Sequence, residues 1–326
     1  MKVYIYYNIT DKPWGGGNSF LKAFRNYIIH NRKDITLVNS INGEYDIFLM
    51  NGGHKDQGIY IDLDEVVKYA KPFSLKKIFT KKKTKVISRL DGIRIRYNKT
   101  KSEMDELQLN ASKLADYVIF QSRECLMSFR EIGYRGQNYS IIYNGVDQDI
   151  FNINRKLKWD KDNGIKILSA AWSSNINKGF EIMSLFSEIE GVESHYVGNW
   201  CKEVNPRKVN IHPPVKQEEL SKHYNKCDLF LHAAQNDSCP NVVLEALSSG
   251  LPVIYHNSGG TPEIASNYGV PLPDVISRES LQVTLDKIKS NYEFLYSRIE
   301  SDMSNFSINN VAEQYLKVFE KVLNED

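Results

Sequence analysis

The chain has 326 residues, 41% of them apolar, and a net charge of +2. Because one ordinary core does not grow to this size, we expect two domains of about 150 residues each. The four cysteines are widely separated, which indicates neither a zinc site nor a disulfide framework. No apolar run approaches the roughly 20 residues of a membrane-spanning helix, and the opening residues MKVYIYYNIT predict a strand rather than a signal peptide. We therefore expect a cytoplasmic protein.

Strands and helices alternate along the whole chain. Strands are predicted at residues 3–8, 35–38, 45–50, 85–89, 117–121, 140–143, 165–170, 194–198, 209–212, 228–232, 252–255 and 270–272. Helices are predicted at residues 18–30, 122–132, 178–189, 218–225, 240–249, 280–292 and 308–323. This alternation is typical of α/β proteins with doubly wound parallel sheets, which bind ligands beyond the carboxyl ends of their strands.

The segment 152–164, NINRKLKWDKDNG, is polar and has no hydrophobic periodicity, so it predicts a hinge between two domains. We expect a first Rossmann-like domain at residues 1–151 and a second at residues 165–307. The last helix, within residues 308–326, is expected to cross back onto the first domain.

Polar residues follow several predicted strands of the first half. The turn WGGGNSF places Gly16 and Gly17 ahead of a helix, where backbone amides can approach an anion closely. His54 follows the third strand, and Asp91 stands two residues after Arg89 at the end of the fourth. We expect His54 and Asp91 to contact a ligand, although a structural ion pair explains Arg89 and Asp91 equally well.

The first half also carries an excess of positive charge. Residues 1–155 contain 25 Lys and Arg against 17 Asp and Glu, and most of the excess lies between Lys68 and Lys101. We hypothesise that this basic segment binds an anionic membrane surface. A solvated basic loop and a site for an anionic acceptor remain alternatives. Nucleic acid is not indicated as a partner, since no nucleic-acid-binding module accompanies the lysines.

The second half contains three loops with chemistry at strand ends. The segment WSSNINKGFEIM after the seventh strand contains Ser173 and Lys178, and a lysine is a mobile point charge suited to phosphate. The segment YHNSGGTPE after the eleventh strand predicts a glycine-rich loop, a Thr cap, Pro at the first helical position and Glu263 in the first turn. Val215, in the loop 213–216, is expected to contact the same ligand.

The segment NDSCPNVVLEALSSGLPVI predicts a loop, a short helix and a strand, with Asp237 and Glu245 eight positions apart. Pro240 suits the first helical position and Gly250 suits a left-handed stop. The helix has an apolar stripe and an opposite polar stripe that contains Glu245. Because helix N-termini favour anions, the helix start at Pro240, with the backbone amides of Asn241 and Val242, marks a phosphate site.

Together these motifs resemble the family 4 retaining glycosyltransferases, which have the GT-B fold of two Rossmann-like doubly wound domains and an interdomain cleft. The Asp-x7-Glu segment looks like the donor-site signature of that family. The segment YNGVDQDIF resembles the loop that closes the first domain, and GGTPE resembles an element beside the donor. Two positions depart from the family pattern, since Asp237 stands where Glu is usual and Ser173 where Arg is frequent.

The resemblance implies transfer of a sugar from a nucleotide diphosphate sugar to an acceptor hydroxyl of a glycan or lipid-linked glycan, with retention of configuration and without a metal or other cofactor. It implies that Glu245 binds the ribose and that Asp237 orients the sugar. It also implies that Lys178 stabilises the departing diphosphate, together with the helix amides near Pro240. The acceptor would enter over the first domain.

Three other interpretations remain open. The segment IYIDLDE places Asp62 and Asp64 after an apolar run, as in a single-domain, metal-dependent glycosyltransferase. A sugar epimerase of related fold and a non-catalytic nucleotide- or glycan-binding protein are the others.

Overall fold

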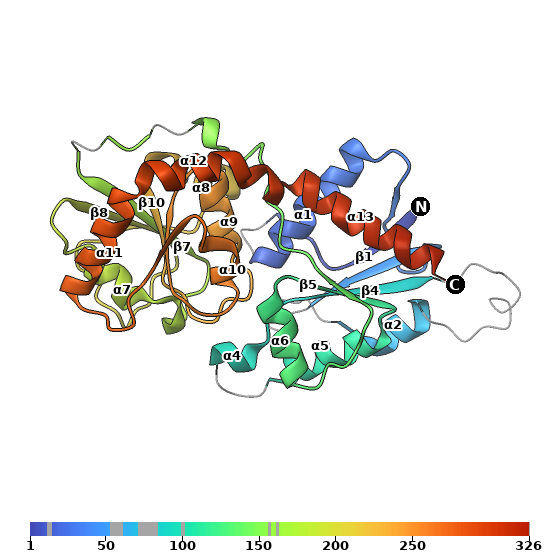
Figure 1. Ribbon diagram of the computed structural model, residues 1–326. Coiled ribbons are helices and arrows are strands. Elements are labelled where there is room, and N and C mark those ends of the chain that lie inside the picture. The colour runs from blue at the N-terminus through green and yellow to red at the C-terminus, as the bar shows by residue number, and fades with distance from the viewer. Residues whose placement is uncertain are drawn as a thin grey trace, which may run out of the picture. The chain divides into compact units, whose positions relative to one another are not determined.

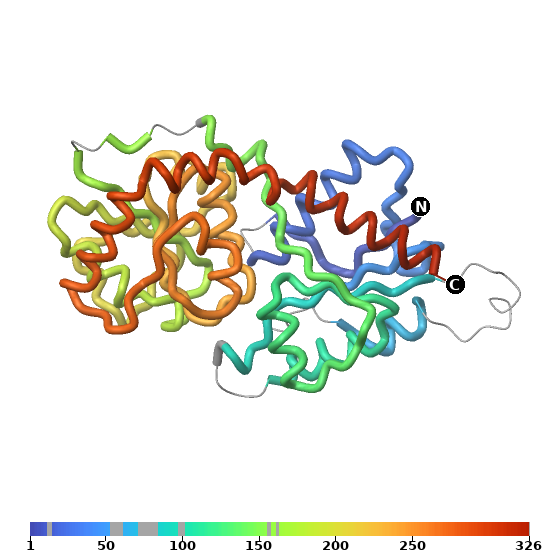
Figure 2. The backbone as a smooth tube through the Cα atoms, in the orientation of Figure 1, coloured from blue at the N-terminus to red at the C-terminus, as the bar shows by residue number. Residues whose placement is uncertain are grey.

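The computed structural model describes residues 1–11, 15–52, 61–70, 84–98, 102–155, 158–160 and 163–325 (Figure 1). The chain forms two compact units. The first contains Met1–Thr10, Phe20–Tyr143 and Ile308–Asp326, and the second contains Asp11–Ser19 and Asn144–Ser307. After Tyr143 the chain stays in the second unit up to Ser307. It returns to the first unit with its last helix, as its path in Figure 2 shows.

The first unit is built on a parallel six-stranded sheet of order β2-β1-β3-β4-β5-β6. Its strands are β1 (Lys2–Tyr6), β2 (Thr36–Val38), β3 (Ile47–Asn51), β4 (Lys85–Leu90), β5 (Tyr117–Phe120) and β6 (Tyr139–Ile141). Its helices are α1 (Gly16–Asn31, whose first four residues group with the second unit), α2 (Leu63–Ala70), α4 (Arg94–Asn98), α5 (Glu103–Leu114), α6 (Arg123–Glu131) and α13 (Ile308–Asn324).

Helices cover both faces of this sheet, and its central strands β3, β4 and β5 are buried along nearly their whole length rather than on alternate residues. All five residues of β3 are buried. One core joins α1 and α13 to the sheet, and it contains Phe24, Tyr315 and Phe319. The ring of Phe24 lies 5.4 Å from that of Tyr315 and meets that of Phe319 edge-on at 6.2 Å. The last helix of the chain is therefore part of the core of the first unit (Figure 1).

The second unit has a second parallel six-stranded sheet, of order β12-β11-β10-β7-β8-β9. Its strands are β7 (Ile165–Ala171), β8 (Val192–Gly198), β9 (Asn210–His212), β10 (Leu229–His232), β11 (Val253–Tyr255) and β12 (Gly269–Pro271). Its helices are α7 (Phe180–Phe186), α8 (Gln217–Lys226), α9 (Asn241–Ser248), α10 (Thr261–Ala265), α11 (Arg278–Ser290) and α12 (Tyr292–Asp302), with the 3-10 helices η2 (Ile153–Arg155), η3 (Ile176–Lys178) and η4 (Met303–Phe306).

The order of this sheet creates a topological switch point between β7 and β10. The chain begins the sheet at β7, extends it through β8 and β9 on one side, and then returns to add β10, β11 and β12 on the other. Loops that leave the carboxyl ends of two such neighbouring strands run in opposite directions, and the crevice between them is the usual ligand site of doubly wound sheets.

All twelve strands predicted from the sequence occur, each with its ends within two residues of the prediction. Among the helices in the described ranges, α2, α4, α5 and α12 were not predicted. The apolar face of α5 is hard to recognise in the sequence, because the helix carries three acidic residues in its first turn, and its start is stabilised by the Ser102 cap. Charged helices of this kind depend on packing against the sheet, which local sequence does not express.

Some predicted helix ends were wrong. Pro240 lies in the extended N-cap position of α9, not at the first helical residue. At α10 the N-cap is Gly260 rather than Thr261, so Pro262 is the second helical residue. The predicted helix at 178–189 starts only at Phe180, because Gly179 adopts a left-handed conformation with φ of 80° between η3 and α7. The predicted stop at Gly250 is confirmed, with φ of 82°.

No helix in the described ranges is long and apolar enough to cross a membrane.

Replacing Phe319 by Ala should destabilise the first unit by about 3–5 kcal/mol, because it removes a buried ring and leaves a cavity beside Phe24. Urea denaturation followed by the far-ultraviolet signal measures this change, since all four tryptophans lie in segments of the second unit. Val283→Ala is the control, since Val283 is 67% exposed and its truncation should cost less than about 0.5 kcal/mol. A loss below about 1 kcal/mol for Phe319→Ala would contradict the placement of α13 in this core.

Candidate functional site

Three loops of the second unit meet at the carboxyl ends of β7, β10 and β11. The loop after β7 ends in Lys178, and its Asn177 carbonyl accepts a hydrogen bond of 3.0 Å from the amide of Gln235 in the loop after β10. Gly179 packs so tightly on Ala233 that a Cβ at this position would overlap the Ala233 carbonyl. The backbone on both sides of Lys178 is therefore held against the end of β10 and the loop after it.

Lys178 and Asp237 form an ion pair across the switch point. The Lys178 Nζ lies 3.2 Å from the Asp237 Oδ2, although 59 positions separate the two residues. Both side chains remain partly exposed, at 18% and 25%, so a ligand can reach them. Burial raises the pKa of Asp237, but the charge of Lys178 outweighs this effect, and the pKa lies below its ordinary value. The Asp237 carboxylate is therefore ionised, and the Lys178 ammonium group lies beside it.

The loop after β11 supports Asp237 from the other side. The Gly260 amide donates to the Asp237 carbonyl at 2.8 Å, and the Asn236 amide donates to Ser258 Oγ at 2.9 Å. Asn236 itself adopts a left-handed conformation with φ of 55°, which Asn tolerates better than most residues. These contacts place the Gly-Gly-Thr-Pro-Glu segment, with Glu263 in α10, against the acidic loop.

Glu245 lies in a different environment from Asp237. It is 6% exposed, and its partners are Gln217 Nε2 at 3.3 Å and Tyr224 Oη at 3.4 Å, both from α8. Burial raises the pKa of Glu245 to about 7, against the lowering effect of these two donors. The predicted polar stripe of α9 was wrong in this respect, because Glu245, Ser248 and Ser249 are all buried. Their neighbours in the fold, not solvent, surround that face.

The N-terminus of α9 is held by side-chain hydrogen bonds. Asn144 Nδ2 donates to Asn241 Oδ1 at 2.7 Å and to the Cys239 carbonyl at 3.3 Å. Asn241 Nδ2 donates in turn to the Gly16 carbonyl at 2.9 Å. A Cβ on Gly16 would lie 3.1 Å from the Asn241 side chain, so glycine permits this approach. The glycine-rich turn, of which Gly17 is also part, therefore packs on the first turn of α9 within the second unit.

Other predicted residues have local roles in the structure. Ser173 is exposed, and its Oγ accepts from the Asn175 amide at 3.2 Å, which shapes the loop before Lys178. Val215 lies in the loop between β9 and α8, just ahead of Gln217. Val242 lies in the first turn of α9, and its carbonyl accepts from Tyr224 Oη at 3.0 Å.

In the first unit, Asp91 belongs to a polar cluster at the carboxyl end of β4. Arg89 is fully buried, donates to Asn51 and, at 2.9 Å, to Asp91 Oδ1, and stacks on the Phe20 ring at 4.5 Å. Gln121 also donates to Asp91. The ion pair that the sequence left open is thus formed, and it fixes the Asp91 carboxylate while 17% of that side chain stays exposed.

Some predictions lie outside the described residues or have another explanation. His54 and residues 71–83 and 99–101 of the basic segment, which hold most of its Lys and Arg residues, are outside the described ranges. Asp62 precedes α2, and its Oδ1 accepts from the amides of Asp64 and Glu65 at 2.9 and 3.1 Å. Asp62 therefore caps a helix, which accounts for the Asp-x-Asp motif without a metal.

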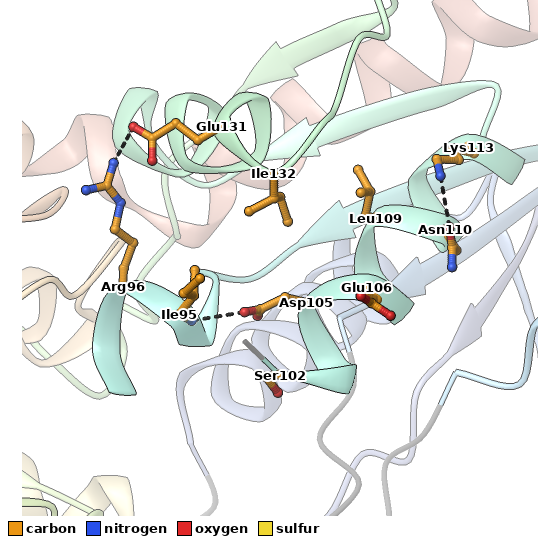
Figure 3. Close-up of a pocket in the computed structure, with 10 residues that line it drawn as sticks. All are labelled: Ile95, Arg96, Ser102, Asp105, Glu106, Leu109, Asn110, Lys113, Glu131 and Ile132. Atoms are coloured by element: carbon orange, nitrogen blue, oxygen red, sulfur yellow. Dashed lines mark hydrogen bonds and ion pairs between the residues drawn. The ribbon is translucent and has the colours of Figure 1, made fainter. Parts of the chain in front are cut away.

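A cavity of about 710 Å³ lies elsewhere in the first unit, between α4, α5 and α6 (Figure 3). Its lining mixes charges, and Arg96 pairs with Glu131 at its edge. Asp105, on the same wall, caps the start of α4 by accepting from the Arg94 and Ile95 amides. Arg96, from the basic segment, lines this cavity, but Asp91, Lys178, Asp237 and Glu245 do not. We place the functional site at the strand ends instead.

Comparisons with known proteins identify relatives of part of the chain. Residues 176–300 match the family described as glycosyl transferases group 1. The spore coat protein SA of Bacillus subtilis is 30% identical over 123 residues, which cover 33% of this chain and 30% of that protein. A probable sucrose-phosphate synthase of Thermosipho melanesiensis is 26% identical over 172 residues, which cover 50% and 39%. The chain thus spans about a third of the length of these curated relatives.

The fold similarity extends over the whole chain. The crystal structure of Anabaena HepE in complex with UDP superimposes with a TM-score of 0.69 at 14% identity, over 98% of this chain and 99% of that one. The two parallel six-stranded sheets with their flanking helices are those of the GT-B fold, as the sequence predicted. The chain thus has the GT-B fold. The stretch of the second unit that matches the group 1 glycosyltransferase family contains Lys178, Asp237 and Glu245.

The sequence did not single out three residues of this site. Gln217 and Tyr224 approach Glu245 from a helix whose pattern shows only one apolar face, so nothing local marks them as its partners. His232 ends an apolar strand, and its Nε2 lies 4.0 Å from Asp237 Oδ2. A polar residue at the carboxyl end of a buried strand was the signal that could have revealed it.

The buried Glu245 should make stability fall as pH rises. Because its pKa is about 7 in the folded chain and 4.5 ordinarily, the folded state binds the extra proton between these values. Stability is then lost from about pH 4.5 to pH 7, by up to about 3 kcal/mol. Denaturant unfolding at pH 5, 6, 7 and 8 measures this loss. Glu245→Gln should flatten the curve, and an unchanged slope in that variant would contradict the assignment.

Proposed function

We propose that the chain is a glycosyltransferase that moves a sugar from a nucleotide diphosphate sugar to an acceptor hydroxyl with retention of configuration. The observation that carries this proposal is the ion pair between Lys178 and Asp237 at the switch point, beside the N-terminus of α9. The crystal structures of HepE contain UDP and UDP-glucose, which supports a donor of this chemical class. UDP is therefore the first nucleotide to test.

In this proposal each group of the second unit contacts one part of the donor. Lys178 and the backbone amides at Asn241 and Val242 bind the diphosphate, where negative charge grows as the glycosidic bond breaks. Asp237 accepts hydrogen bonds from sugar hydroxyls. Glu245 accepts from the ribose hydroxyls and releases its proton as they bind. Val215, Ser173 and Glu263 lie on the loops around these groups and complete the donor pocket.

No protein nucleophile and no metal are required in this scheme. The leaving diphosphate can accept the proton of the incoming hydroxyl on the same face of the sugar, which retains the anomeric configuration. An ammonium group and fixed amide dipoles supply the stabilisation that a metal gives in other enzymes.

We assign the acceptor to the first unit. Asp91, fixed by Arg89 and Gln121, offers carboxylate oxygens to a hydroxyl-bearing acceptor, and we retain His54 as a second acceptor contact. The sequence of the basic segment favours an acceptor that is a glycan or a lipid-linked glycan at a membrane surface.

The donor assignment predicts specific losses. In a thermal-shift series with UDP, GDP, ADP and their glucose conjugates, the nucleotides of one base should raise the melting temperature. At a ligand concentration of 100 times Kd, the gain in the free energy of unfolding is about 2.7 kcal/mol. Lys178→Ala should abolish most of this shift and lower the transfer rate by about 10²–10³, because it removes the cation from the leaving group. Lys287→Ala, an exposed lysine of α11, is the matched control.

Transfer rates equal to that of the wild type in both Lys178→Ala and Glu245→Ala would refute the site. Product analysis distinguishes the alternative functions, since an epimerase releases a free sugar and a non-catalytic binding protein shows a thermal shift without turnover.

Membrane binding is tested by sedimentation with liposomes. The protein should bind vesicles with about 30% anionic lipid more tightly than neutral vesicles. The triple variant K81S/K82S/K83S should lose about 100-fold in affinity, since each lysine near an anionic surface contributes about 1 kcal/mol. Equal binding to neutral and anionic vesicles would remove the membrane from the proposal.

A further inference from the structure

His232 combines burial with an unpartnered nitrogen. The side chain is the last of β10, in the interior of the second sheet, and the residue is 4% exposed. Its Nε2 has no hydrogen-bond partner among the residues that the structure describes. Leaving a buried polar atom without a partner is unfavourable, and such atoms call for an explanation.

The Nε2 points toward a group of the donor site. Asp237 Oδ2 is 4.0 Å away, and the same oxygen is held by Lys178 at 3.2 Å. Two side-chain nitrogens thus converge on one carboxylate oxygen, one in contact and the other about 1 Å beyond hydrogen-bond distance. Burial lowers the pKa of His232 to about 4, with Lys178 and His256 adding to this and Asp237 opposing it, so the imidazole is neutral at physiological pH.

The two donors differ in mobility. His232 stands on an interior strand, and its ring lies nearly parallel to that of Phe230, with 6.5 Å between centroids and an 18° interplanar angle. Its carbonyl also accepts from the His256 amide at 2.9 Å, as part of the pairing with β11. Lys178 instead has a flexible four-carbon side chain that can follow a moving anion.

We propose that His232 is a positioning residue for Asp237: when the donor diphosphate attracts Lys178, the Nε2–H of His232 takes over Oδ2 and keeps the carboxylate directed at the sugar. This inference rests on the proposed function and refines it. It also gives a reason why Asp, which is shorter than Glu, serves at this position, since the imidazole Nε2 on β10 lies 4.0 Å from its Oδ2.

The change required is small. A rotation of the Asp237 side chain that closes about 1 Å brings Oδ2 within hydrogen-bond distance of Nε2. No proton is transferred and no bond is broken, because the neutral imidazole carries one N–H and the carboxylate accepts it. Oδ2 loses its contact with Lys178 whenever the diphosphate binds the lysine. In a chain without His232, no imidazole N–H would replace that contact.

The experiment compares His232→Phe, which keeps a ring but removes Nε2, with His232→Gln, which places an amide nitrogen near the Nε2 position. Release of nucleoside diphosphate from UDP-, GDP- or ADP-glucose is measured with and without sugar acceptors. We expect kcat to fall by about 10- to 100-fold in His232→Phe, with KM for the donor and Kd for UDP changed less than about threefold. His232→Gln should restore most of kcat. His195→Phe, the same change on β8, is the control.

A double-mutant cycle with Asp237→Asn tests whether His232 acts through Asp237. In that background His232→Phe should cost less than about threefold, because the group that it positions has already been altered. A full additional loss would overturn the proposal, as would an unchanged kcat in His232→Phe. Parallel losses in UDP affinity and kcat that Gln does not rescue would show a merely structural role and would also overturn it.

A binding measurement keeps the inference testable if the variants fold poorly. In the wild-type protein labelled with ¹⁵N-histidine, saturation with UDP should shift the Nε2 resonance of His232 toward that of a hydrogen-bonded donor, and the shift should be absent in Asp237→Asn. An unchanged resonance at saturation refutes the role of His232 while the proposed function stands. A wild type that neither binds any of the three diphosphates nor cleaves their glucose conjugates refutes the proposed function itself.

Discussion

The proposed donor site depends on the pairing of Lys178 with Asp237, and that pairing depends on the strand order of the second sheet. Because β7 opens the sheet and β10 is added on its other side, the loops that follow these strands leave from neighbouring positions and in opposite directions. The two charged residues can then meet at 3.2 Å across 59 positions of sequence. Gly179 and the hydrogen bond from Gln235 to Asn177 fix the distance between the loops.

Two carboxylates of one short segment acquire opposite acid–base behaviour from their surroundings. Asp237 has a cation at its oxygen, so its pKa is lowered despite burial. Glu245 has the neutral donors Gln217 and Tyr224, and burial raises its pKa to about 7. Such a separation of pKa values between neighbouring acids gives each a distinct role. A group that stays charged suits a permanent contact with sugar hydroxyls, whereas Glu245 can couple its proton to the arrival of the ribose.

The same principle of a fixed residue that orients a carboxylate recurs in the first unit. Arg89 is buried between Phe20 and Asn51 and holds Asp91, whose carboxylate is also bound by Gln121. Asn51, Arg89 and Gln121 lie at or just after the carboxyl ends of the neighbouring strands β3, β4 and β5. In both units a rigid strand-end residue lies beside a carboxylate that is partly exposed at the surface of the unit.

The sequence by itself determined the class of fold, the strands and the loops that carry chemistry. Short apolar runs between glycine-rich turns identify buried parallel strands locally, and the spacing of Asp237, Glu245 and Lys178 marks the donor motifs. It did not determine the helices α2, α4, α5 and α12 or the burial of Glu245, because these depend on which surfaces the sheet presents to them. Only the tertiary structure decided that His232 faces Asp237 and that Tyr224 faces Glu245. Such contacts join residues from separate strands and helices, and a linear pattern records periodicity along one element but not which element lies opposite.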